Sequence, residues 1–140
     1  MRSALILAAA LTATACTTAD FAGHSKGNIH GQKWTAESIN GRSVLDNTEI
    51  TMTIAEDGKM RGTAGCQSYV AKAFLDGSDE IGVGALAISK QGCHGAKLDQ
   101  QMRFVRAMML AERYEMNGAN TLYVYSEGEG KPLTFKASKR

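Results

Sequence analysis

Four dipeptides in which Asn or Asp precedes Gly divide this chain into short segments, and they restrict its fold more than any other feature. They lie at Asn40-Gly41, Asp57-Gly58, Asp76-Gly77 and Asn117-Gly118. Such dipeptides favour β-hairpins, because a type I′ turn needs positive φ at both central residues. The composition, with 15 Gly against 1 Pro, also favours many tight turns. A β-rich fold is therefore expected.

The segments between these turns alternate in the manner of half-buried strands. Within residues 50–55, the apolar residues Ile50, Met52 and Ile54 alternate with two threonines. One face of this strand is therefore expected to be buried. Similar arguments place strands at residues 33–39, 50–55, 59–64, 70–75, 80–83, 85–89, 112–116, 121–125 and 132–136.

One segment changes to the period of a helix. Its apolar residues recur at spacings of three and four: Leu98, Met102, Phe104, Val105, Met108 and Met109. The opposite face holds polar residues: Asp99, Gln100, Arg103 and Arg106. This pattern predicts an amphipathic helix that lies on the sheet. The expected fold is a β-rich α+β fold, a small curled sheet or barrel of about eight short antiparallel strands with one amphipathic helix over an open side.

The N-terminus has the features of an export signal. Arg2 is followed by an almost wholly apolar run over residues 3–11. This run is shorter than the roughly 20 apolar residues of a transmembrane helix, and it fits the apolar part of a signal peptide. Residues 1–15 are therefore predicted to be a signal peptide.

The next residues predict lipid attachment at Cys16. The stretch from Leu11 to Cys16 resembles a bacterial lipobox, in which the chain is cut before the Cys and its sulfur is linked to diacylglycerol. Ala13 stands where Leu is usual, and Ala13-Thr14-Ala15 also matches the ordinary signal peptidase site. Both enzymes would cut after Ala15. Because a free exposed thiol is a liability in an oxidising compartment, we predict that Cys16 is lipidated.

Residues 16–31 are polar, contain Gly and show no apolar periodicity. They are predicted to be a flexible, lipid-anchored tether. The protein is thus expected to be exported and held on a membrane, facing the periplasm. Thr17 follows Cys16 in place of the Asp associated with inner-membrane retention, which favours the outer membrane.

The remaining residues predict no catalytic, cofactor or metal site, and we expect the protein not to be an enzyme. Residues 23–27 match the G-x-S-x-G pattern of hydrolases but lie in the polar tether, without the strand that this motif needs. Cys93 and His94 could be a nucleophile and its base, yet sequence neighbours rarely face each other. Cys66, Cys93 and His94 lack the spacing of zinc ligands.

The charge of the chain excludes a typical nucleic-acid footprint. The 16 basic and 14 acidic residues give a net charge of +2, and the three positive charges within residues 136–140 are expected to be a solvated tail. Nucleic-acid binding favours a strongly basic balance with clustered Lys and Arg. No nucleic-acid partner is therefore expected.

The order of these features resembles the META domain family, which includes the heat-shock protein HslJ. The resemblance is carried by Trp34, Ile39-Asn40-Gly41, Gly62-Thr63-Ala64-Gly65-Cys66, Ile81-Gly82, Cys93, Leu122-Tyr123-Val124 and Leu133-Thr134-Phe135. It predicts a META domain over residues 32–137. It also implies a bacterial envelope protein, often a lipoprotein, that is tied to stress and antibiotic tolerance and has no established molecular activity.

The resemblance further implies a disulfide between Cys66 and Cys93, since the two cysteines tend to occur together in the family. The even number of cysteines in the domain agrees with this pairing. Two departures lie nearby. Gln67 stands where the family usually has Asn, and Ser89-Lys90-Gln91-Gly92 replaces a segment that usually carries Thr and a small or apolar residue.

Two functions are compatible with these features. The first is a non-enzymatic envelope lipoprotein with an interaction or stress-tolerance role, under heat or antibiotic challenge, that binds another envelope protein. Tyr69, Tyr123 and Tyr125 are its candidate contact residues, since Tyr is enriched at interfaces. The alternative is a binder of a small ligand or peptide, such as a protease inhibitor. An apolar cavity inside the barrel would favour the small ligand, and a filled core would not.

Overall fold

Ten strands and one helix make up residues 28–138, the part of the chain that the computed structural model describes. In chain order they are β1 (Trp34–Ile39), β2 (Arg42–Ser43), β3 (Thr51–Ile54), β4 (Lys59–Thr63), β5 (Ser68–Leu75), β6 (Ile81–Val83), β7 (Ala87–Ile88), α1 (Gly95–Met109), β8 (Ala111–Asn117), β9 (Thr121–Ser126) and β10 (Leu133–Ala137). No helix among these residues is long and apolar enough to cross a bilayer.

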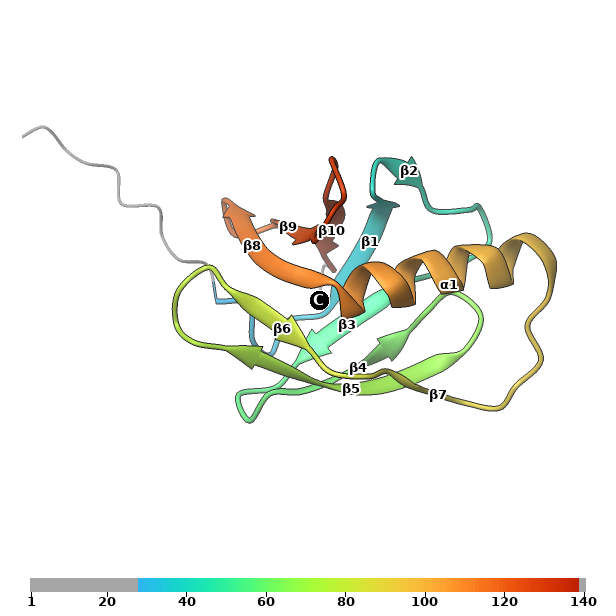
Figure 1. The fold of residues 1–140 in the computed structure, drawn as a ribbon, viewed down its shortest axis with the longest axis horizontal. Coiled ribbons are helices and arrows are strands. Elements are labelled where there is room, and N and C mark those ends of the chain that lie inside the picture. Colours follow the sequence, from blue (N-terminus) through green and yellow to red (C-terminus); the bar gives the residue numbers. More distant parts are fainter. Residues whose placement is uncertain (1–27, 139–140) are drawn as a thin grey trace, which may run out of the picture.

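The strands form one antiparallel sheet that curls into a nearly closed barrel (Figure 1). Its order is β6-β5-β4-β3-β1-β10-β9-β8, while β2 pairs with β1 and β7 pairs with β5. The two ends of this order meet, because the Tyr114 N–H donates to the Asp79 carbonyl oxygen at 2.8 Å, and Glu80 forms an isolated bridge with Arg113. The expected strand-rich barrel with one helix is confirmed.

Apolar side chains from most strands and from α1 fill the interior of this barrel. Trp34 on β1 is fully buried, and its Nε1 donates to the Ile29 carbonyl oxygen at 3.1 Å. Ile50, Met52 and Ile54 are buried as predicted, but Thr51, predicted on the other face, is buried as well. The other buried residues around them include Ile39, Met60, Phe104, Met108, Leu122, Val124, Leu133 and Phe135.

Residues 28–31, which the sequence assigned to the tether, lie against the domain. Ile29 is buried in the core, and the Gly31 N–H donates to the Ile54 carbonyl oxygen at 2.8 Å. The packed domain therefore begins before Gln32. The predicted signal peptide (residues 1–15), the lipidation site Cys16 and the tether up to residue 27 lie outside the described residues.

Helix α1 lies across the open side of the barrel, between β1 and β2 on one side and β4, β5 and β7 on the other (Figure 1). The helix and the burial of Phe104, Val105 and Met108 were predicted correctly. The predicted orientation was wrong for Met102 and Met109, which were expected inside, and for Gln100, which was expected outside. Met102 and Met109 are 54% and 50% exposed, whereas the glutamines at positions 100 and 101 are buried. The glutamine amides are tolerated inside because each one finds hydrogen-bond partners there.

The close approach of β3 and β4 explains the glycine at position 62. A Cβ atom added at Gly62 would overlap the Thr51 carbonyl oxygen of β3. The same oxygen accepts a hydrogen bond from the Tyr69 hydroxyl at 2.8 Å. A side chain at position 62 would force β3 and β4 apart. It would also disturb the buried hydrogen bond between the Tyr69 hydroxyl and the Thr51 carbonyl oxygen. Glycine is therefore required by close packing, as at other sites where backbones approach each other.

The variant Gly62→Ala is expected to lower the free energy of unfolding by about 2–3 kcal/mol, because backbone atoms must move to admit the methyl group. Urea unfolding followed by tryptophan fluorescence measures the effect, since Trp34 lies in the core. Gly130→Ala is the matched control, because an added Cβ there meets no atom within 4 Å. Equal stability of the two variants would contradict the packing argument.

Candidate functional site

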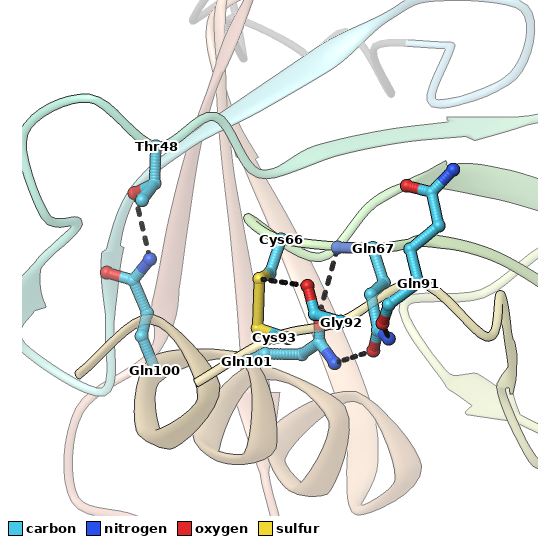
Figure 2. Close-up of a disulfide and its surroundings, with 8 residues drawn as sticks. All are labelled: Thr48, Cys66, Gln67, Gln91, Gly92, Cys93, Gln100 and Gln101. Atoms are coloured by element: carbon cyan, nitrogen blue, oxygen red, sulfur yellow. Dashed lines mark hydrogen bonds between the residues drawn. A yellow bond between two sulfur atoms is a disulfide. The ribbon is translucent and has the colours of Figure 1, made fainter. Parts of the chain in front are cut away.

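A disulfide between Cys66 and Cys93 joins the β4–β5 turn to the segment that leads into α1 (Figure 2). The two Cα atoms are 5.9 Å apart, and 27 positions separate the residues in the sequence. The pairing implied by the family resemblance is therefore present. Because Cys93 directly precedes the helix cap, the bond fixes where α1 begins relative to the sheet.

Gln67, Gln91 and Gln101 lie near this disulfide and add hydrogen bonds between the same regions of the chain that it joins (Figure 2). Gln101 on α1 accepts a hydrogen bond from the Gln67 N–H at 3.1 Å, and its Nε2 donates to Gln67 Oε1 at 2.6 Å. The Nε2 of Gln67 donates in turn to the Gln91 carbonyl oxygen. Gln67, which replaces the Asn usual in the family, thus links the β4–β5 turn both to α1 and to the segment before it.

The neighbouring Gln100 connects α1 to a different loop, the one between β2 and β3. Its Oε1 accepts from the Leu45 N–H at 2.7 Å, and its Nε2 donates to Thr48 Oγ1 at 2.9 Å. The side chain is fully buried. Two adjacent amides in the second turn of α1 therefore hold opposite edges of the open side of the barrel. This outcome was missed from the sequence because Gln100 had been placed on the solvent face.

The far end of α1 is also connected to the sheet. The buried Ser126 hydroxyl at the end of β9 donates to the Ala107 carbonyl oxygen at 2.7 Å. This bond satisfies one carbonyl of the last helical turn, where no further intrahelical donor follows. Polar groups thus hold the helix at its second turn and again at its last turn, and between them Phe104 packs against the Tyr69 ring at a centroid distance of 5.6 Å.

This arrangement supports a structural role for the site. The amides of Gln67 and Gln101 hydrogen-bond to each other, and the amide of Gln100 hydrogen-bonds to the β2–β3 loop. The sulfur of Cys93 is in a disulfide, which removes the thiolate needed for a Cys93–His94 nucleophile and base. Between residues 28 and 138, no three His, Cys, Asp or Glu side chains are grouped as metal ligands would be.

The three candidate contact tyrosines differ in exposure. The prediction for Tyr69 was wrong, because this side chain is buried beneath α1 and burial raises the pKa of its hydroxyl. Tyr123 and Tyr125 on β9 are half-buried. The Arg113 guanidinium lies 3.9 Å from the centre of the Tyr125 ring, within the distance of a cation–π contact. These two tyrosines stay candidate contacts.

The outer face of β5 exposes apolar residues that the sequence analysis did not single out. Val70 and Phe74 are 59% and 60% exposed, and Lys72 lies between them on the same face. Phe74 also lines a hollow of about 620 Å³ beside β6, together with acidic side chains such as Asp57 and Glu112. Alternation alone could not identify this face, because small and large apolar residues occupy both sides of the strand.

The fold and the comparison with known families identify the class of protein. The family model of the META domain matches residues 27–140, so this chain belongs to the META domain family. No curated protein matches the chain.

Three solved structures share the fold at 19% sequence identity. A solution NMR structure covers 77% of this chain and 90% of its own, with a TM-score of 0.60. An NMR structure of a protein from Burkholderia xenovorans covers 80% and 85%, with a TM-score of 0.61. The crystal structure of a DUF4847 family protein from Bacteroides vulgatus covers 65% and 60%, with a TM-score of 0.50.

Removal of the disulfide in the double variant Cys66→Ala/Cys93→Ala is expected to lower the free energy of unfolding by about 3 kcal/mol, because the unfolded chain loses a covalent loop. Urea unfolding of the oxidised protein measures the change. Cys16→Ser is the matched control and should leave the stability unchanged, since it alters a cysteine outside the bond. A double variant as stable as this control would contradict the structural role.

Proposed function

We propose that this META domain protein is exported, carries a lipid on Cys16, and acts without catalysis by binding another protein of the cell envelope. In this proposal the anchor holds the domain on the periplasmic side of a membrane, with the outer membrane preferred. Binding would contribute to tolerance of envelope stress, such as heat or antibiotic challenge. The family membership of the chain is compatible with this role but does not specify it.

The disulfide is the observation that carries the proposal of export. Disulfides persist in oxidising compartments and are rare in the bacterial cytoplasm. Cys66 and Cys93 pair with each other, which leaves Cys16 as the third cysteine of the sequence. A cysteine at the end of an export signal and two paired cysteines in the domain agree with a lipid-anchored envelope protein.

A binding role is supported by what the interior and the surface offer. The barrel is filled by its own side chains, including Trp34, Met52 and Phe135. A small ligand inside the barrel therefore has no observation in its favour. The exposed Val70 and Phe74 on β5 instead offer apolar contact area, and aromatic residues are enriched at protein interfaces. We place the protein contact on this outer face of β5.

The lipid anchor predicts the mass of the natively processed protein. The mature chain should begin at Cys16 and carry the added mass of the lipid, because cleavage precedes the modified cysteine. Intact-mass spectrometry of membrane-extracted protein measures this. In Cys16→Ala the lipid mass should be absent, and the protein should leave the membrane fraction. An unmodified chain that begins at Cys16 would contradict the anchor.

The β5 face predicts a position-specific cross-link in intact cells. A photo-cross-linking residue in place of Phe74 should give a discrete adduct with an envelope protein, because Phe74 lies on the proposed contact face. The same residue in place of Met102 is the matched control, since that position is comparably exposed but lies on α1. The adduct should be absent there.

Two outcomes would decide against this contact. Equal adducts from both positions would show that the β5 face has no special role. An adduct with a secreted protease would instead support the peptide-binding alternative, in which the domain is an inhibitor.

A further inference from the structure

A second surface hollow, on another part of the molecule, is lined by three arginines. It has a volume of about 420 Å³ and lies where the β1–β2 hairpin, α1 and the β9–β10 loop meet. Its lining residues are Ile39, Asn40, Arg42, Arg103, Arg106 and Glu129. The hollow therefore presents three guanidinium groups and one carboxylate. We refer to it as the arginine pocket.

The arginines come from two separate elements. Arg103 and Arg106 are three positions apart on α1, so they share one face of the helix. Arg42 is the first residue of β2, directly after the Asn40-Gly41 turn. The turn places Asn40 in the left-handed region, at φ 49°. The helix and the hairpin thus bring together charges that are some 60 positions apart in the sequence.

These guanidinium groups have no anionic partner in the described part of the chain. The ion pairs found between residues 28 and 138 join other residues, and the carboxylate of Glu129 takes part in none of them. Nε of Arg103 is buried and has no hydrogen-bond partner, and the same holds for Oδ1 of Asn40. Unpaired buried polar atoms of this kind are uncommon in folded proteins.

Like charges without a counter-charge disfavour each other, so an anion in the arginine pocket would be bound favourably. Guanidinium groups present paired N–H donors that match the oxygens of a phosphate, often two at a time. A tetrahedral phosphate ester can meet donors arriving from both β2 and α1. The volume lies within the range of roughly 300–1,000 Å³ that is typical of small-molecule sites, which leaves room for more than a bare ion.

We propose that the arginine pocket binds the phosphate group of a phosphorylated polyol such as a glycerol phosphate. Arg42, Arg103 and Arg106 contact the phosphate oxygens. Glu129 and Asn40 offer oxygen atoms that accept hydrogen bonds from hydroxyl groups of the polyol. The Glu129 carboxylate therefore contacts the polyol and not the phosphate. The group can belong to a soluble phosphate ester or to the headgroup of a lipid such as phosphatidylglycerol.

Calorimetric titration of the full chain with sn-glycerol 3-phosphate at low ionic strength tests the soluble source. We expect saturable binding that weakens as sodium chloride is added. Arg42→Gln and Arg103→Gln should each weaken it about tenfold, because each removes charge-assisted hydrogen bonds. Arg61→Gln is the matched control, since Arg61 is an exposed arginine on β4 outside the pocket. It should bind like the wild type.

Vesicle sedimentation tests the lipid source. The full chain carrying Cys16→Ser, which removes any anchor, is mixed with vesicles of phosphatidylcholine alone or with added phosphatidylglycerol. Sedimentation that needs phosphatidylglycerol and is lost with Arg42→Gln, but not with Arg61→Gln, would assign the pocket to a lipid headgroup. Titration binding with the same pattern would assign it to a soluble ester. Either result supports the phosphate site.

The proposal is overturned when neither probe binds, or when the Arg42→Gln and Arg61→Gln proteins lose binding equally, which would indicate a general effect of surface charge. Thermal unfolding without ligand separates binding from folding. Arg42 lies exposed at a strand end, so Arg42→Gln is expected to melt like the wild type. This variant carries the test even if Arg103→Gln unfolds at a lower temperature.

Discussion

The attachment of α1 across the open side of the curled sheet is the constraint on which the rest of this structure depends. The end strands of this curled sheet meet over a short stretch, at residues 79–80 and 113–114, and the apolar interior beyond that stretch needs another cover. Here the Cys66–Cys93 bond fixes the start of the helix, and the buried amides of Gln100 and Gln101 join it to two different loops. The helix that they hold in place carries Phe104 and Met108, which are fully buried in the core.

This closure also separates a buried apolar interior from the groups that remain at the surface. The helix completes a core with fully buried side chains from most strands, and the polar groups around the disulfide hydrogen-bond to one another. Two groups of side chains at the surface remain open to a partner or ligand. They are the apolar pair Val70 and Phe74 on β5, and the arginine pocket on another part of the molecule. The proposed protein contact and the proposed phosphate site use these two separate surfaces.

The sequence predicted the elements better than their orientations. Alternation located the strands, since a period of two has only two possible faces and turn residues mark both ends. An apolar stripe on a helix fixes the buried face less well, because the helix can rotate about its axis and still bury several of its apolar residues. The sequence therefore placed Met102 inside and Gln100 outside, and the structure has the reverse. Tyr69 was misjudged for a related reason, since only the packing of Phe104 against it shows which face of β5 is inward.

The sequence by itself determined the strand-rich fold with a single late helix, because turn chemistry and side-chain period are local properties. The order of its motifs indicated the family, and the resemblance together with the even number of cysteines in the domain implied the Cys66–Cys93 pair. Only the tertiary structure decided which amides are buried, which apolar residues remain exposed, and that Arg42 lies beside Arg103 and Arg106. These properties depend on contacts between segments far apart in the chain. Such contacts are set by how the sheet curls and how the helix is rotated on it, and no local pattern encodes either.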